Sequence, residues 1–329
     1  MAPQVQNAPT IDRSITLDLV GDWGQATFHK ILGWLSQEFC DRAGPRSRTR
    51  TWTVCGGGVE AIPLVHNGEA DLCVVTPNQL MAGAISGQGI FAQYGSMPHL
   101  RALAVLPQRD RMILAVHPKL GVQSFEDIRQ TAPALEIATS KDDGTSFIGY
   151  VATQLLAAHG ITTETLRKSG GKFVEFTRPH ECLAAAIDGR ANAVIQEAIM
   201  LPEWNELVEK HGWIPIQVET AAIKSLLVPG FSGDSLPEHF WSTRPDEIHA
   251  IDFSDFLLVV RDDMPSDVAE LLTWCLVHTR ANLERQFKHI PPEKCALTYP
   301  LDPVAMSKTS LELHPGARKV YQDIGVLRG

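Results

Sequence analysis

Short apolar runs alternate along the chain with Gly-rich or polar turns and with stretches in which apolar residues recur at helical spacing. The first run, residues 14–20, has the period of two that is typical of a strand, and a turn joins it to a helical pattern. The cycle repeats many times. It predicts strands at 14–20, 50–54, 71–76, 100–106, 111–116, 135–139, 172–177, 193–196 and 255–260. It predicts helices at 27–43, 59–67, 125–130, 147–159, 179–188, 199–211 and 268–287, and others opening at Pro77 and near Pro315.

Strands that alternate with helices favour an α/β fold whose sheets are joined by crossover connections. The cycle restarts near Val122, and strand character returns at Asp255 after a polar stretch, residues 230–252, that is rich in Pro and Gly. This order predicts two interleaved lobes. Lobe 1 is expected to combine residues 1–116 and 229–329, and lobe 2 is expected to be residues 117–228. The stretch 230–252 is interpreted as an irregular lid or crossover.

Length and composition are compatible with two lobes that each have a substantial hydrophobic core. The chain has 329 residues, of which 44% are hydrophobic and 20% charged, so wholesale disorder is excluded. Lysine and arginine total 29 against 38 acidic residues, a formal net charge of −9. An acidic chain without a long basic run is a poor candidate for binding nucleic acid.

The sequence also bears on location and on redox state. It begins MAPQVQNAPT, shows no secretory signal pattern, and contains no apolar run that approaches about 18 residues, so no membrane span is expected. A cytoplasmic location is therefore predicted, and a periplasmic one only if a leader has been removed. The six cysteines fit no zinc or haem spacing; they favour a reducing compartment, and three disulfides remain open. No metal and no cofactor are predicted.

Three segments together resemble the TAXI-type solute-binding proteins of TRAP transporters. Residues 56–71 read GGGVEAIPLVHNGEAD, residues 100–127 resemble the family's paired crossover strands, and residues 313–327 are close to its terminal H-P-G-A signature. The resemblance covers nearly the whole chain. It implies a type 2 periplasmic-binding-protein fold: two α/β lobes, each a mixed, mainly parallel sheet flanked by helices, with a ligand cleft between the lobes.

Two loops depart from the family pattern. The first loop of the family is rich in Gly and Thr, whereas residues 21–25 read GDWGQ. The second-lobe loop of the family is a small, neutral anion cradle, whereas residues 140–146 read SKDDGTS. Two carboxylates at such a loop repel an acidic ligand unless Lys141 or protonation compensates. The usual ligands of the family, small carboxylates such as glutamate, are therefore in question.

Candidate ligand contacts follow from strand ends and helix starts, where free backbone N–H groups and the helix dipole favour anions. Each candidate also has a purely structural reading: Gly turns that only join elements, helix capping by Thr76, or packing of the tryptophans. The residues predicted to contact a ligand are Trp23, Gly24, Gln25, Gly57, Gly58, Val59, Thr76, Asn78, Gly144, Thr145, Ser146, Gln196, Glu197, His239 and Trp241. The remaining histidines show no metal-binding spacing.

Two functions from different classes remain open. The first is a small-molecule binding protein whose ligand is an organic, carboxylate-bearing or aromatic compound, and effector sensing in the cytoplasm is a further possibility beside the two. The second is a cofactor-free lyase or decarboxylase that acts on an aromatic or unsaturated acid in a biosynthetic pathway. The catalytic candidates in that case are Lys141, Asp142, Asp143 and Asp22, and the structural reading of the first three is a solvated turn in which Asp143 caps a helix.

Overall fold

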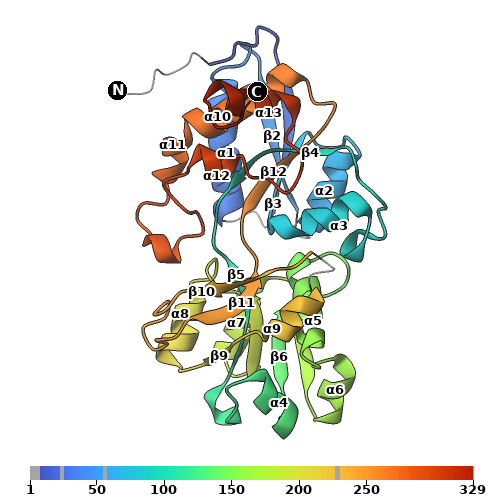
Figure 1. Cartoon of the computed structure of the whole chain (residues 1–329), viewed down its shortest axis with the longest axis vertical. Coiled ribbons are helices and arrows are strands. Elements are labelled where there is room, and N and C mark those ends of the chain that lie inside the picture. Colours follow the sequence, from blue (N-terminus) through green and yellow to red (C-terminus); the bar gives the residue numbers. More distant parts are fainter. Residues whose placement is uncertain (1–7, 23–25, 55–57, 227–229, 329) are drawn as a thin grey trace. The chain divides into compact units, whose positions relative to one another are not determined.

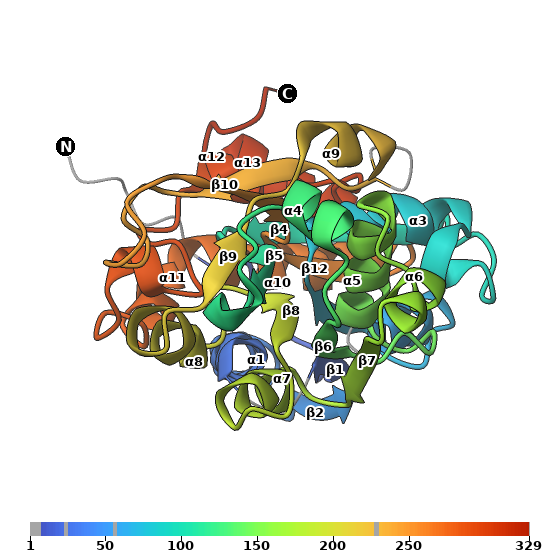
Figure 2. The ribbon, with the colours of Figure 1, turned by 90° about the horizontal axis from the view of Figure 1, so that it is seen from below.

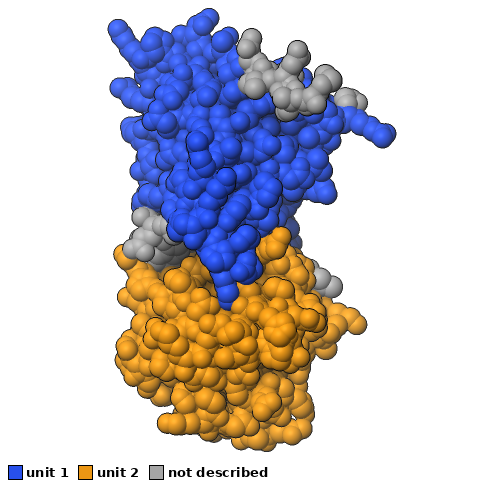
Figure 3. Space-filling view, turned by 90° about the vertical axis from the view of Figure 1, so that its left-hand side faces the viewer, with its two compact units in different colours: residues 1–108, 255–329 blue, residues 109–254 orange. Residues whose placement is uncertain are grey.

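The chain folds into two compact units, each with its own sheet (Figure 1). The computed structural model describes residues 8–22, 26–54, 58–226 and 230–328. Unit 1 is Met1–Gln108 with Asp255–Gly329, and unit 2 is Arg109–Ser254 (Figure 3). Unit 2 is thus a single continuous segment inserted into unit 1.

Unit 1 is built on a five-stranded mixed sheet of order β2-β1-β3-β12-β4. Strand β1 pairs in parallel with β2 and β3, and β12 pairs antiparallel with β3 and β4. The strands are β1 (Thr16–Asp22), β2 (Arg48–Val54), β3 (Leu72–Val75), β4 (Leu100–Leu106) and β12 (Phe256–Arg261). Because β12 lies between β3 and β4, the last part of the chain completes the sheet that the first part begins.

Helices cover this sheet. They are α1 (Ala26–Cys40), α2 (Gly58–His66), α3 (Met81–Ser86), α10 (Ser266–His278), α11 (Arg280–Glu284), α12 (Pro303–Met306) and α13 (Pro315–Asp323). Short 3₁₀ turns at Asn78–Leu80, Gly89–Phe91 and Pro292–Lys294 complete the unit. Helix α10 is buried over most of its length because its sequence, SDVAELLTWCLVH, is apolar nearly all round.

Unit 2 holds the second mixed sheet, of order β10-β11-β5-β8-β6-β7, with β9 paired to β5. Strand β6 is parallel to β7 and β8, and β5 is antiparallel to β8, β9 and β11. The strands are β5 (Arg111–Val116), β6 (Glu136–Ser140), β7 (Lys172–Phe176), β8 (Ala193–Glu197), β9 (Ile214–Ile216), β10 (Gly233–Leu236) and β11 (Ile248–Asp252). The apolar run in β5 is buried at every position, as is typical of a strand covered on both faces of its sheet.

The helices of unit 2 are mostly short (Figure 2). They are α4 (Phe125–Thr131), α5 (Phe147–Ala158), α6 (Thr163–Lys168), α7 (Pro179–Ile187), α8 (Glu203–Asn205) and α9 (Thr220–Leu226), with a 3₁₀ turn at Pro118–Leu120 and a π-helical turn at Glu206–Lys210. Trp204, Trp213 and Trp241 are all fully buried in the hydrophobic cluster of this unit.

The predicted α/β fold class with two mixed sheets and flanking helices is confirmed, and the unit boundaries lie elsewhere than predicted. Residues 109–116 and 230–254 belong to unit 2, because β10 pairs with β11, β11 with β5, and β5 with β8. Each sheet was predicted to be mainly parallel, but fewer of the strand pairs are parallel than expected. In each sheet the crossover strand, β5 or β12, pairs antiparallel with its neighbours.

The stretch 230–252 is not the irregular lid that its composition predicted. It contains β10 and β11, which form an antiparallel pair with Gly233 opposite Ile251 and Leu236 opposite Ile248. The predicted helix at 199–211 begins only at Glu203, because Pro202 disfavours helical geometry at the residue before it. The N–H groups of Ile199 and Met200 donate to a buried carboxylate. The predicted helix at 268–287 breaks into α10 and α11 at Thr279.

The terminal H-P-G-A signature has a packing role. The imidazole Nδ1 of His314 accepts a hydrogen bond from the N–H of Gly316 at 3.1 Å and so caps α13. A Cβ on Gly316 would lie 2.3 Å from the carbonyl oxygen of Ser266, so only glycine lets α13 approach α10 this closely. The residues of this signature therefore cap α13 and allow it to pack closely on α10.

Two further findings concern the described residues as a whole. The cysteines at positions 40, 73, 182, 275 and 295 are all free thiols, so none of these five forms a disulfide. No helix within the described ranges is long and apolar enough to cross a membrane.

Candidate functional site

The loop that follows β6 in unit 2 carries the polar residues that stood out in the sequence. Lys141, Asp142 and Asp143 are exposed in it, and Gly144 adopts a left-handed conformation with φ of 82°. The loop ends at Ser146, which is 8% exposed and stands at the N-terminus of α5. It therefore joins the carboxyl end of a parallel strand to the positive end of a twelve-residue helix.

Hydrogen bonds inside this loop assign different roles to two of its residues. Oδ1 of Asp143 accepts from the N–H of Thr145 at 3.1 Å and from its hydroxyl at 2.6 Å. The Thr145 hydroxyl lowers the pKa of the Asp143 carboxyl, so this group is ionised at neutral pH. The cap of α5 is Ser146, whose Oγ accepts from the N–H of Gly149 at 3.3 Å. Asp143 therefore shapes the turn and does not cap the helix, contrary to the structural reading of the sequence.

Helix α5 packs directly against the loop through Gly149. A Cβ at this position would lie 1.9 Å from the carbonyl oxygen of Lys141. Since Cβ atoms are never found so close to a backbone oxygen, the loop backbone can rest on the helix only where the side chain is absent. The absence of a side chain at Gly149 thus allows the loop backbone to lie directly against the N-terminal turn of α5.

Buried polar side chains lie behind the loop at the ends of β6 and β8. Gln196 is fully buried, and its Nε2 donates to Oγ of Ser140 at 2.8 Å and to Sγ of Cys182 at 3.1 Å. In the described part of the chain, Oε1 of Gln196 and Oγ1 of Thr139 have no hydrogen-bond partner. Glu197 is also buried, and its carbonyl oxygen accepts from the indole N–H of Trp204 at 2.6 Å. Gln196 therefore supports the loop from within and does not reach solvent.

The segment after β8 is held by the carboxylate of a residue that directly precedes β5. Asp110 is 0% exposed and precedes β5. Its Oδ1 accepts from the N–H groups of Ile199 at 2.9 Å and Arg111 at 2.7 Å, and its Oδ2 accepts from the N–H of Met200 at 3.0 Å. Burial raises the pKa of Asp110 to about 6, and these N–H donors limit the rise. Asp110 thus satisfies two backbone N–H groups of the segment between β8 and α8.

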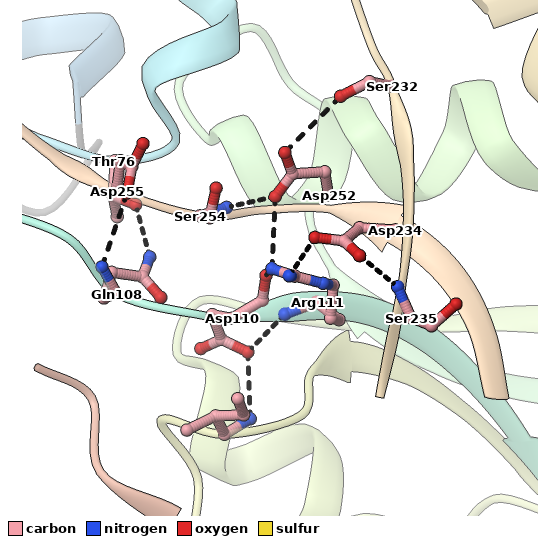
Figure 4. Close-up of polar contacts among 11 residues, drawn as sticks. Thr76, Gln108, Asp110, Arg111, Ser232, Asp234, Ser235, Asp252, Ser254 and Asp255 are labelled. Carbon is pink, nitrogen blue, oxygen red and sulfur yellow. Dashed lines mark hydrogen bonds and ion pairs between the residues drawn. The ribbon is translucent and has the colours of Figure 1, made fainter. Parts of the chain in front are cut away.

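An arginine network lies beside Asp110 in unit 2 (Figure 4). The guanidinium of Arg111 is 7% exposed, donates to the carbonyl oxygen of Asp110 at 2.7 Å, and forms ion pairs with Asp234 and Asp252. Ser232 and Ser254 complete the set through hydrogen bonds to the Asp252 carboxylate. These residues connect β5 to β10 and β11, so they stabilise the strands that the sequence placed in a lid.

Unit 1 has its own polar cluster near the ends of β3 and β4. The Thr76 hydroxyl accepts from Nε2 of Gln108 at 3.0 Å, and the backbone N–H of Gln108 donates to Asp255 at 3.4 Å (Figure 4). Asn78 bonds to the hydroxyl of Ser310. Thr76 does not cap the turn that follows, since no side chain caps Asn78–Leu80. Both predicted contact residues are thus engaged within unit 1.

A family model described as the NMT1-like family matches residues 43–325, most of the chain. The chain belongs to the NMT1-like family. No curated protein matches the sequence of this NMT1-like chain.

Solved structures similar to the NMT1-like chain have the periplasmic-binding-protein fold. PhnD1 from Prochlorococcus marinus, in complex with methylphosphonate, has a TM-score of 0.51 at 12% identity, over 95% of this chain and 99% of that one. MatC from Rhodopseudomonas palustris, with bound malate, has a TM-score of 0.52 at 12% identity, over 95% and 96%. XAC2383 from Xanthomonas citri, bound to ATP, has a TM-score of 0.50 at 13% identity, over 94% and 99%. At these identities the similarity establishes the fold.

The other residues of the NMT1-like chain that were predicted to contact a ligand lie at a helix start, in the core of unit 2, in an exposed turn, or outside the described residues. Gly58 and Val59 are buried at the start of α2. Trp241 is 0% exposed in the core of unit 2, where Trp204 packs at 5.8 Å between ring centroids, so its role is packing. His239 is exposed in a turn with φ of 57°. Trp23, Gly24, Gln25, Gly57 and the side chain of Asp22 lie outside the described residues.

The sequence did not single out Asp110 or Arg111. The sequence feature that could have identified them is the run of charged residues at the start of the apolar strand 111–116, in LPQRDRMILAV. Acidic and basic residues next to a buried strand must find partners, because unpaired buried charge is costly. The partners, Ile199, Asp234 and Asp252, are distant in sequence, so only the structure identifies them.

Proposed function

We propose that this chain is a binding protein for a small organic anion and that the loop 140–146 with the first turn of α5 receives the anionic group. One observation carries the proposal: a Gly-containing loop at the carboxyl end of a parallel strand leads into the positive end of a twelve-residue helix capped by Ser146. Such helix starts attract anions through their N–H groups and dipole. We also propose that the chain is similar in role to the TAXI-type solute-binding proteins, whose sequence patterns it shares.

The charges of the loop are compatible with an anionic ligand. Lys141 is exposed beside the turn and supplies a positive charge. Oδ1 of Asp143 is taken up by Thr145, so this carboxylate serves the turn itself. Similar structures are also bound to anions, namely methylphosphonate, malate and ATP, and this supports an anionic ligand here.

The alternative, lyase or decarboxylase chemistry at the same loop, is not favoured. A general acid must hold its proton near neutral pH, which requires a raised carboxyl pKa. Hydrogen bonding from Thr145 does the reverse at Asp143. Lys141, Asp142 and Asp143 are also exposed, whereas water exclusion is what strengthens the electrostatic effects of a catalytic site.

The proposal is tested by ligand-induced stabilisation. The melting temperature is measured with a panel of aliphatic dicarboxylates, aromatic carboxylates and phosphonates, and bound ligand is quantified by calorimetry. A true ligand at about 100 times its Kd should stabilise the fold by roughly 2.7 kcal/mol. Lys141→Ala combined with Ser146→Ala should reduce affinity at least tenfold, since a charge and the cap are both removed.

Ser124→Ala is the matched control. Ser124 caps α4 in the same unit by accepting from the N–H of Asp127 at 3.0 Å, so its removal costs a similar cap without touching the loop. Equal loss of affinity in the control and the loop variant would refute the site. Disappearance of the ligand with formation of a product, followed by mass spectrometry, would favour the enzyme.

The cytoplasmic location stays a prediction. It is tested by fractionating cells that express the native gene and detecting the protein with an antibody. Recovery in the periplasmic fraction would contradict it and would agree with a role in solute capture for transport.

A further inference from the structure

Strand β2 forms one edge of the five-stranded sheet of unit 1. All seven of its residues pair in register with β1, from Arg48 opposite Thr16 to Val54 opposite Asp22. Among the described strands only β1 pairs with β2, which lies beyond β1 at the edge of the sheet (Figure 2). The outer N–H and C=O groups of β2 therefore face away from the sheet. The strand is regular and lacks the Pro and the bulges that usually protect such edges. It is a suitable template for a further strand.

The opposite edge of the same sheet is protected. Strand β4 is bridged by the C-terminal segment, in which Leu313 pairs with Ala102. The N–H of Ala102 donates to the carbonyl oxygen of Glu312, and the N–H of His314 donates to that of Ala102, both at 2.9 Å. The contrast between a covered β4 and an uncovered β2 marks the β2 edge as the one available for pairing.

The two faces of β2 differ in chemistry. Thr53 faces α1, where its hydroxyl lies 3.0 Å from Nε2 of His29. The side chains of Arg48, Arg50 and Trp52 alternate with the threonines and so lie on the other face, where all three are exposed. Trp52 is 40% exposed, which is unusual for so large an aromatic. The exposed face thus presents an arginine and a tryptophan two positions apart.

Antiparallel pairing of β2 with β2 of a second copy is self-complementary in one register. With Thr51 on the two-fold axis, Arg50 of each copy lies opposite Trp52 of the other, and Thr49 lies opposite Thr53. Cross-strand pairs of this kind each stabilise by roughly 0.2–1 kcal/mol, and an arginine over tryptophan adds a cation–π attraction. With Arg50 on the axis, two arginines would be opposite each other, which is unfavourable.

The Arg50 side chain has a partner within its own unit. Its Nε and Nη2 each donate to the carboxylate of Asp18 on β1 at 2.6 Å. This bidentate pair fixes the plane of the guanidinium on the β1 side of β2, so Trp52 of the other copy must reach across the β2 backbone to stack on it.

We propose that two copies of this chain associate through their β2 edges, antiparallel and with Thr51 on the two-fold axis, to form a continuous ten-stranded sheet. The interface is isologous, because the same residues contribute from each copy. It is a small interface, so the association is weak and depends on protein concentration.

Cysteine crosslinking tests the register. Thr51→Cys places two thiols opposite each other, so a bis-maleimide with a spacer of about 8 Å should give a covalent dimer whose yield rises with protein concentration. Arg48→Cys is the matched control on the same strand: in the proposed register its two copies are six positions apart, or about 20 Å at 3.4 Å per residue. The unsubstituted chain reports any crosslinking through native thiols.

Sedimentation velocity of the unlabelled protein is the second measurement. The unsubstituted chain should show a dimer fraction that grows with concentration, and Trp52→Ala should weaken the association at least threefold while circular dichroism stays unchanged. A chain that is monomeric at every concentration, or equal crosslinking at positions 48 and 51, would overturn the proposal. A monomer whose tryptophan fluorescence responds to an acidic extended peptide, with no response in Trp52→Ala, would overturn it too and would assign the edge to such a peptide.

Discussion

Asp110 shows how one buried carboxylate can determine the path of a distant segment. Its two oxygens accept from the N–H groups of Arg111, Ile199 and Met200, so the segment that follows β8 is anchored to the residue that precedes β5. Burial disfavours the charged form and raises the pKa of Asp110 to about 6, from an ordinary value of 3.8. The folded protein therefore binds a proton at Asp110 more tightly than the unfolded chain does.

This difference in pKa predicts a pH effect on stability. The stabilisation that proton binding at Asp110 contributes is fully present below about pH 4 and is lost as the pH rises through about 6. Asp110→Asn removes that titration and turns an amide N–H₂ toward the N–H of Met200, which should cost about 1–3 kcal/mol. Urea unfolding of the parent and of Asp110→Asn from pH 4 to 7 measures both effects. The free energy of unfolding of the parent should exceed that of the variant by a smaller amount as the pH rises.

The comparison of parent and variant cancels the other carboxylates. Glu126, Asp127 and Asp262, for example, have lowered pKa values because of hydrogen bonds, and they stabilise both proteins in the same way as the pH rises. Parallel curves of unfolding free energy against pH for the two proteins would show that Asp110 titrates alike in both states.

At the scale of an element, the contact between α5 and the loop after β6 is set by a missing side chain. Gly149→Ala would place a Cβ 1.9 Å from the carbonyl oxygen of Lys141, so the loop must move. We expect a loss of about 1–3 kcal/mol in the free energy of unfolding, together with weaker ligand binding. Chemical unfolding and calorimetry measure the two effects.

Gly33→Ala in α1 is the control for this substitution. Gly33 is exposed within the helix, and a Cβ there would have no neighbour within 4 Å. Replacing glycine by alanine in a helix should stabilise the protein by about 0.5–1 kcal/mol. A destabilising Gly33→Ala, or a neutral Gly149→Ala, would contradict the explanation by close approach.

The elements that the sequence predicts well are those with strong local patterns. The apolar run of β5 and the helical spacing of α5 depend little on distant partners, and both appear at the expected places. Strands β10 and β11 were missed because their regularity comes from pairing with each other and, through β11, with β5, more than 100 residues earlier. Ser146 was predicted from its place at a helix start, whereas Asp110 depends on donors about 90 residues away.

At the scale of the whole molecule, the chain order gives the two units different autonomy. Unit 2 is continuous, Arg109–Ser254, with a complete sheet and its own buried cluster. Unit 1 needs both ends of the chain, because β12 lies between β3 and β4 and pairs with each. Without β12, the backbone groups of two buried strands would lack partners, which is costly.

This topology predicts opposite behaviour for two fragments. Residues 109–254 expressed alone should be soluble, show an α/β circular dichroism spectrum and unfold cooperatively in urea, because every strand of that sheet is present. Residues 1–108 should not fold cooperatively, but joining them to residues 255–329 through a short flexible linker should restore a cooperative transition by returning β12 to its place. If residues 1–108 fold alone, or if 109–254 do not, the sheet order is not what determines the autonomy of the two units.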